Sequence, residues 1–204
     1  MLEFVNRYAS NTYSQNGEDG IVAECLRRMQ IGKGSCVEIG ANDGQWCSNT
    51  ARLIELGFSG LMIEADAILA QRCEDRWRHN PDVITVCCEA SGRNVNAFVT
   101  RDVELFSADT DGCDYDIFAG LKAKPKICIV EIDSSLPPLD HVFNKDGGAG
   151  YLPMVELGLE KGYFVLSHTG NLIFVDTYFQ KLFPEVKGDP IKNCQQYFNC
   201  AWQT

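Results

Sequence analysis

Short apolar runs alternate with helix-like or polar segments along most of this 204-residue chain. Runs with the length of a buried strand lie at residues 36–39, 61–63, 83–88, 105–108, 127–130, 163–168 and 172–176. Alternation of strands and helices is typical of a parallel sheet. The last two runs, separated by Thr169-Gly170-Asn171, instead indicate an antiparallel hairpin. We therefore predict an α/β fold with a Rossmann-like, seven-stranded, mostly parallel sheet, a C-terminal antiparallel hairpin and helices on both faces.

We expect one domain over residues 1–204, made of a helical lead-in (1–34), a core (35–176) and an aromatic tail (177–204). In the lead-in, Ser14 or Asn16 is expected to cap a helix that begins near Glu18. Helices are also expected from the glycine-containing loop after residue 39 to about residue 56, over 67–79 and over 151–161, and an extra strand or a loop over 94–102. The tail is expected to pack against the sheet or to form a homodimer contact through Phe179, Phe183, Tyr197, Phe198 and Trp202.

Composition excludes several classes of protein. A hydrophobic content of 45% with 23% charged residues is typical of a globular domain. The net charge of −10 argues against non-specific binding to nucleic acid or to an anionic membrane. No apolar run reaches the roughly 20 residues that span a bilayer, and the start of the chain lacks the pattern of a signal peptide, so we expect a cytoplasmic protein.

The ten cysteines do not indicate a zinc site, because none forms a C-x-x-C pair. We expect them to be reduced and mostly buried, including Cys36, Cys87, Cys88 and Cys128 in strand-like runs. The D-x-D-G sequence at 109–112 also differs from a calcium-binding loop in the place of its glycine, so no metal site is expected.

A glycine-containing loop follows the first strand-like run, with the sequence E-I-G-A-N-D-G over residues 38–44. Gly40 and Gly44 are expected to let the backbone turn sharply and to leave room for a ligand. Glu64 ends the next strand-like run, 20 residues after Gly44, where such folds place a carboxylate that binds ribose hydroxyls. Loop, helix and acid in this order predict a nucleoside site.

The glycine spacing indicates which nucleoside binds. It differs from the G-x-G-x-x-G pattern of dinucleotide sites, and the carboxylates of Glu38 and Asp43 would repel a diphosphate. S-adenosylmethionine has no phosphate and carries a sulfonium, which suits an acidic site. The E-I-G-A-N-D-G sequence resembles the first motif of class I methyltransferases, which bind this cofactor.

Four separated motifs extend the likeness to the FkbM-like methyltransferase family. They are S-Q-N-G-E-D (14–19), the first motif with S-N-T (48–50) and G-F-S-G-L-M-I-E (57–64), S-A-D-T-D-G-C-D-Y (107–115), and K-G-Y with G-N-L-I-F-V-D (161–176). The resemblance implies that Asp109 and Asp111 lie beside the transferred methyl group. It leaves open whether Gln15 and Glu18 face the pocket or only cap the helix. Ala108 and Asp111 depart from the family's usual branched aliphatic residue and glutamate.

Asp109 is the first candidate for a catalytic base, and His168 and His141 are weaker ones. The candidates for cofactor binding are Gln15, Glu38, Gly40, Asn42, Asp43, Gly44, Asn49, Glu64, Ala65, Asp66, Glu89, Ala90, Asp109 and Asp111.

The expected activity is transfer of a methyl group from S-adenosylmethionine to a hydroxyl of a small molecule or saccharide. Two alternatives stay open: a domain that binds S-adenosylmethionine or another nucleoside without catalysis, and an NAD-dependent oxidoreductase. Fold alone does not separate them.

Overall fold

The computed structural model describes residues 7–192. In chain order its elements are α2 (Glu18–Met29), β1 (Ser35–Ile39), α3 (Ala51–Glu55), β2 (Ser59–Glu64), α4 (Ala67–Trp77), β3 (Val83–Cys87), α5 (Val95–Phe98), β4 (Leu105–Ala108), α6 (Asp114–Gly120), β5 (Ile127–Glu131), α7 (Tyr151–Glu160), β6 (Tyr163–His168), β7 (Asn171–Asp176) and the 3-10 helix η1 (Thr177–Leu182). Alternation of strands and helices confirms the predicted α/β class.

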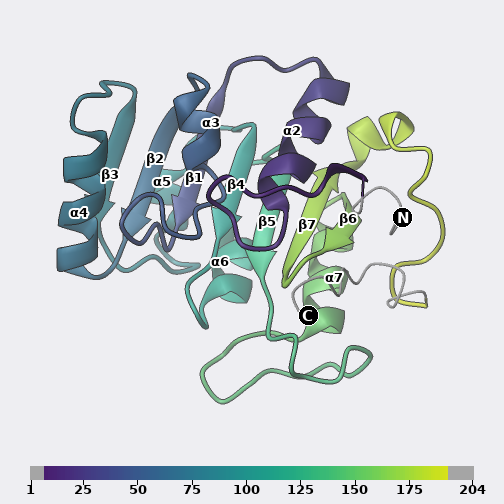
Figure 1. Ribbon diagram of the computed structural model, residues 1–204. Coiled ribbons are helices and arrows are strands. Elements are labelled where there is room, and N and C mark those ends of the chain that lie inside the picture. The colour runs from purple at the N-terminus through teal and green to yellow at the C-terminus, as the bar shows by residue number, and fades with distance from the viewer. Residues whose placement is uncertain (1–6, 193–204) are drawn as a thin grey trace.

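The strands form one seven-stranded sheet in the order β3-β2-β1-β4-β5-β7-β6 (Figure 1). Strands β1 to β5 are parallel, and β7 is antiparallel to both β5 and β6. The hairpin between β6 and β7 turns at Gly170, whose φ of 105° is open to glycine and strained for other residues. The predicted mostly parallel sheet and its C-terminal hairpin are therefore confirmed.

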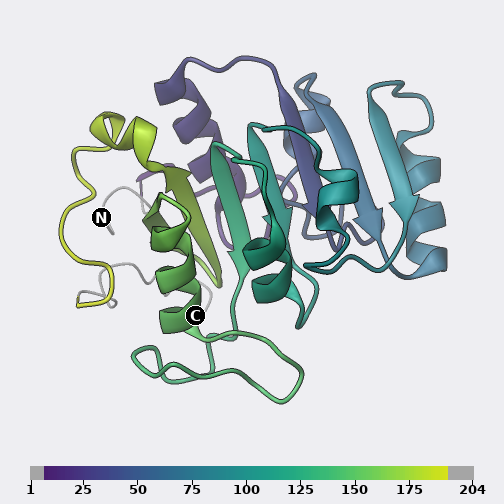
Figure 2. The same ribbon diagram turned by 180° about the vertical axis from the view of Figure 1, so that it is seen from behind.

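Helices cover both faces of the sheet, as Figures 1 and 2 show from opposite sides. Buried side chains of α2, α3 and α4 form one core with the sheet, and those of α5, α6 and α7 form another. Because five parallel strands end at the same edge, the connections after β1, β2, β4 and β5 converge there. The long connection after β5 extends from this edge in Figure 1.

The helix predicted to reach residue 56 is much shorter than expected, since α3 covers only Ala51–Glu55. The reason lies in the Glu38 carboxylate, which accepts hydrogen bonds from the Ser48 hydroxyl (2.5 Å), the Asn49 amide (2.7 Å) and the Thr50 hydroxyl (2.7 Å). These bonds hold residues 48–50 against the end of β1 in a non-helical path.

Three smaller predictions were wrong in detail. Cys87 is exposed and Cys88 half-buried, because β3 is an edge strand of the sheet. Residues 95–98 form the short helix α5 instead of the expected strand or loop. Gly17 occupies the cap position of α2, although the Ser14 hydroxyl accepts a hydrogen bond from the Asp19 amide in the first turn.

The first part of the tail packs against the sheet as predicted, with the buried Phe183 ring 5.6 Å from that of Phe164. Tyr197, Phe198 and Trp202 lie outside the described residues. Within residues 7–192, none of the helices has both the length and the apolar character needed to cross a membrane.

Candidate functional site

Two adjoining cavities lie at the carboxyl ends of the parallel strands. The larger, of about 600 Å³, is lined by Gln15, Glu38, Ile39, Gly40, Asn42, Trp46, Cys47, Ile63, Glu64, Ala65, Leu69, Cys88, Glu89, Ala90, Asp109, Thr110, Asp111, Cys113 and Glu131. The smaller, of about 210 Å³, is lined by Gln15, Asn16, Glu18, Cys47, Asn49, Asp109, Glu131, Ile132, Ser134, Gly170 and Asn171. The two share Gln15, Cys47, Asp109 and Glu131, so these four residues lie where the cavities meet.

Gly40 lines the larger cavity in a left-handed conformation, with φ of 81°. A Cβ atom at this position would lie 1.7 Å from the carbonyl oxygen of Asp109. The loop after β1 therefore needs glycine to pass the end of β4, a clearance within the protein itself. The sharp turn expected from the sequence is present, and the clash that glycine avoids is with the Asp109 carbonyl.

Gly44 has a similar role outside the cavity. Its φ is 80°, and an added Cβ would lie 2.7 Å from the Cys73 sulfur and 2.8 Å from Nε1 of Trp77. Gly44 thus lets the loop pack against α4. It is absent from the residues that line the larger cavity, so its contribution to a ligand site is indirect.

Glu64 ends β2 at the wall of the larger cavity, where its two carboxylate oxygens are held by backbone amides. Oε2 accepts a hydrogen bond from the Asn42 amide (2.7 Å) and Oε1 accepts one from the Asp66 amide (2.9 Å). Each oxygen has a second lone pair, so the group can still accept hydrogen bonds from a ligand. The carboxylate is therefore fixed in place before a ligand arrives.

Glu38 is 3% exposed at the end of β1 and also borders the larger cavity. Burial raises its pKa to about 7, against the opposing effect of the hydrogen bonds from residues 48–50. The Asn49 side-chain amide in turn donates to the hydroxyl of Ser107 on β4, at 3.0 Å. Glu38 and Asn49 thus link β1, β4 and the loop between β1 and α3.

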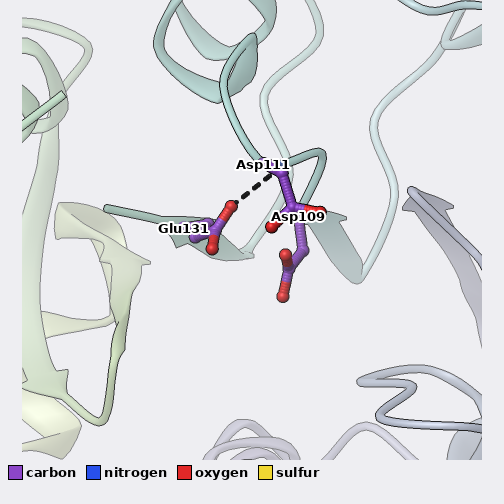
Figure 3. A group of neighbouring side chains, drawn as sticks. All are labelled: Asp109, Asp111 and Glu131. Carbon is purple, nitrogen blue, oxygen red and sulfur yellow. Dashed lines mark hydrogen bonds between the residues drawn. The ribbon is translucent and has the colours of Figure 1, made fainter. Parts of the chain in front are cut away.

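Asp109, Asp111 and Glu131 gather where β4 and β5 end (Figure 3). One carboxylate oxygen from each lies within 4.8 Å of the others, and the Asp111 amide donates to Oε2 of Glu131 at 3.0 Å. Burial and the charge of Asp114 raise the pKa of Asp109 to about 6. Burial and the charge of Asp109 raise the pKa of Glu131 to about 8. The group can hold a proton at neutral pH.

The lead-in closes the smaller cavity from the side of α2. Glu18 is 1% exposed and accepts hydrogen bonds from the Asn16 amide (2.8 Å) and from the hydroxyl of Thr169 (2.6 Å). Burial raises the pKa of the Glu18 carboxyl. Gln15 borders both cavities and Glu18 borders the smaller one. The sequence left open whether Gln15 and Glu18 face the pocket or only cap the helix. In the structure both residues line a cavity.

Six of the other cofactor-binding candidates line a cavity and two do not. Asn42, Ala65, Glu89, Ala90 and Asp111 line the larger cavity, and Asn49 lines the smaller one. Asp43 and Asp66 are absent from both linings. Asp43 lies 3.2 Å from Arg76 in an ion pair, so it no longer supports the argument that its charge repels a diphosphate. Asp66 caps α4 by accepting from the amides of Ile68 and Leu69.

Neither histidine lines a cavity. His168 is 1% exposed, its Nε2 lies 3.0 Å from the Ser134 hydroxyl, and burial lowers its pKa to about 4. Its Nε2 contacts Ser134, which lines the smaller cavity. His141 lies in the connection after β5, where Nε2 is 3.6 Å from the exposed Glu156.

Sequence reasoning missed Glu131, Cys47 and Trp46 as cavity residues. Glu131 had a usable signal, because it is an acid at the end of the strand next to β4 in a fold whose ligands bind at strand ends. Trp46 is 71% exposed and Cys47 has a positive φ of 58° in an irregular turn. No sequence pattern places such a turn.

Comparisons by sequence found no matching family model and no matching curated protein. Comparisons by structure found many. The S-adenosylmethionine-dependent methyltransferase from Clostridium acetobutylicum matches with a TM-score of 0.52 and 10% identity, over 77% of this chain and 88% of that chain. A Staphylococcus aureus protein, provisionally assigned as a caffeoyl-CoA O-methyltransferase, matches with a TM-score of 0.54 and 12% identity, over 85% and 90%.

TehB from Haemophilus influenzae also matches, with a TM-score of 0.54 and 10% identity. The match covers 85% of this chain and 65% of TehB, just under two thirds of the longer protein. At such identities the likeness concerns the fold. The chain has the Rossmann-like fold of class I S-adenosylmethionine-dependent methyltransferases, with the strand order and terminal hairpin described above.

Proposed function

We propose that this protein is an S-adenosylmethionine-dependent methyltransferase that acts on a hydroxyl oxygen of a small molecule or saccharide. The charge of the larger cavity carries the proposal. Its lining contains the acids Glu38, Glu64, Glu89, Asp109, Asp111 and Glu131, and within residues 7–192 no lysine, arginine or histidine lines it. Such a site favours a cationic ligand and disfavours an anionic one.

The acidic lining and the backbone of the loop after β1 both argue against an NAD-dependent oxidoreductase. Dinucleotide sites bring backbone amides at a helix N-terminus onto the pyrophosphate. Here the loop after β1 does not lead into a helix, because α3 begins only at Ala51. The amides of Asn42 and Asp43 are already taken by the oxygens of Glu64 and of the Asn42 side chain. A diphosphate would meet carboxylates and occupied amides.

The residues present fit the proposed cofactor. Glu64 holds two oxygens in fixed positions at the wall of the larger cavity, as a ribose diol requires. Ala65, Glu89 and Ala90 follow β2 and β3 and would border the adenine, while Glu38, Asp109 and Gln15 would border the charged end. When bound, S-adenosylmethionine supplies a methyl group already activated by positive sulfur. The protein then contributes alignment, exclusion of water and a proton acceptor.

The four sequence motifs support a place within the FkbM-like family and acceptors that carry hydroxyl groups. The geometry is compatible with that assignment, because Asp109 lies where the two cavities meet. The provisional assignment of one structural neighbour as an O-methyltransferase points the same way.

A transfer assay tests the proposal. The protein is incubated with S-adenosylmethionine labelled in its methyl group and with a panel of sugars, sugar alcohols and phenols. We expect label in a methyl ether and one equivalent of S-adenosylhomocysteine. Asp109→Asn serves as the active-site control. Tight binding of S-adenosylmethionine without transfer to any panel member would instead favour the non-catalytic binding domain.

A further inference from the structure

Glu131 has no part in the function proposed from the sequence, yet it occupies the centre of the site. It borders both cavities together with Asp109. A cofactor in the larger cavity and an acceptor in the smaller one would therefore both border this pair of carboxyls. The Asp111 amide fixes Oε2 of Glu131, and that bond uses only one of the carboxylate's four lone-pair sites. The remaining sites can take a proton or a ligand hydroxyl.

Several further acids lie close to the pair. Asp111 follows β4, Asp114 begins α6, Glu18 begins α2 and Glu38 is the second-last residue of β1. His168 on β6 lies 3.0 Å from the Ser134 hydroxyl through its Nε2, and burial lowers its pKa to about 4, so it is neutral near pH 7. Among the described residues that line either cavity, none is lysine, arginine or histidine. In the free protein no cation among these lining residues balances the pair.

Two carboxyls this close cannot both ionise without cost, so one proton is retained between them near neutral pH. Burial and the neighbouring acids raise the pKa of both groups, and a hydrogen bond between them opposes the rise for Asp109. A positive charge placed in the larger cavity would reverse this balance, because it favours the fully ionised pair.

We infer that Asp109 and Glu131 act as one proton-accepting unit, which releases its shared proton when the sulfonium cofactor binds and takes a proton from the acceptor hydroxyl during transfer. This inference rests on the proposed methyltransferase function. It adds Glu131 as a catalytic residue. It also means that the pair of Asp109 and Glu131 holds one proton when no cofactor is bound.

The transfer step balances. The acceptor oxygen forms a bond to the methyl carbon, the bond from that carbon to sulfur breaks, and its electron pair stays on sulfur. The hydroxyl proton passes to the pair formed by Asp109 and Glu131. The products are a methyl ether, a neutral thioether and a pair that again holds one proton. Because the positive charge has gone, the pair no longer favours the bound product, which assists its release.

Proton release on binding tests this inference without knowledge of the acceptor. Calorimetric titrations at about pH 7 in two buffers of different ionisation enthalpy give the number of protons exchanged. We expect about one proton released per S-adenosylmethionine bound, and almost none for S-adenosylhomocysteine, which differs by the methyl group and its charge. Glu131→Gln should abolish the difference between the two ligands. Glu104→Gln, an acid outside the lining of both cavities, should retain it.

The possible outcomes distinguish a failure of this inference from a failure of the proposed function. Binding of S-adenosylmethionine with no proton release, or with the same release as S-adenosylhomocysteine, overturns the inference and leaves the proposed function standing. Absence of any S-adenosylmethionine binding overturns both. If Glu131→Gln does not fold, the comparison of the two ligands on the unaltered protein still decides.

Discussion

The amide of Asn42 donates a hydrogen bond to the carboxylate of Glu64, 2.7 Å away, and so ties the loop after β1 to the end of β2. The opposite oxygen of Glu64 accepts from the Asp66 amide at 2.9 Å. A carboxylate held on both sides has little freedom left to lose when a ligand binds. Glu64 is therefore preorganised to accept hydrogen bonds from a ligand.

Glu64→Gln should weaken binding of S-adenosylmethionine by about 10- to 100-fold, or ~1–3 kcal/mol, because a charge-assisted acceptor is lost. The side-chain NH2 group of the glutamine will also face a backbone N–H donor, so a modest loss of stability is expected. Glu104→Gln is the matched control, since Glu104 accepts from the Ser35 amide (2.6 Å) outside the lining of both cavities. It should affect stability and leave affinity unchanged. Equal affinity for Glu64→Gln and the parent protein would remove Glu64 from the cofactor site.

Gly40→Ala should destabilise the fold strongly, because its Cβ would lie 1.7 Å from the Asp109 carbonyl oxygen. Gly57→Ala is the matched control: Gly57 has φ of 91°, and no atom lies within 4 Å of an added Cβ. The control should cost only the roughly 1–2 kcal/mol of a left-handed alanine. Urea unfolding measures both, and similar losses for the two variants would show that the clash at Gly40 relaxes easily.

The ligand-free protein should become less stable as pH rises from about 4 to about 8. Folding raises the pKa of Asp109 to about 6, of Glu38 to about 7 and of Glu131 to about 8. Over this range the unfolded chain loses these protons first, so the folded protein binds more of them and the free energy of unfolding falls with pH. Melting temperatures across the range measure the slope. Glu131→Gln should flatten it, and a slope of opposite sign would contradict these shifts.

Asp109→Asn should leave cofactor affinity largely intact while turnover falls by ~10²-fold or more, as expected when a proton acceptor is removed. Single-turnover rates and calorimetric affinities on the same preparation separate the two effects. A parallel fall of affinity and rate would mean that Asp109 holds the cofactor. Wild-type turnover would exclude Asp109 and shift attention to Glu131.

The fold was predictable because its signals are local. Buried runs of strand length and the turn at Gly170 indicated the parallel sheet and its terminal hairpin. The length of α3 was not predictable, since it depends on the Glu38 carboxylate meeting Ser48, Asn49 and Thr50. Hydrogen-bond partners 10 to 12 residues away along the chain leave no mark in helical periodicity.

The site was predictable only in part for a similar reason. Acids at the ends of β1, β2 and β4 follow a general rule for open sheets, and Glu38, Glu64 and Asp109 obey it. Asp43 has the same position in the sequence pattern, yet Arg76 on α4 draws it into an ion pair. Glu131 follows the rule too, but only the pairing of β5 with β4 shows that it meets Asp109.

The central claim is that the acidic cavity binds S-adenosylmethionine and not a dinucleotide. Calorimetric titration of the purified protein with S-adenosylmethionine and, separately, with NAD measures this most directly. The structure predicts saturable binding of S-adenosylmethionine at one site, weakened in Glu64→Gln and preserved in Glu104→Gln, and no heat of binding with NAD. Saturable binding of NAD, with no response to S-adenosylmethionine, would contradict it.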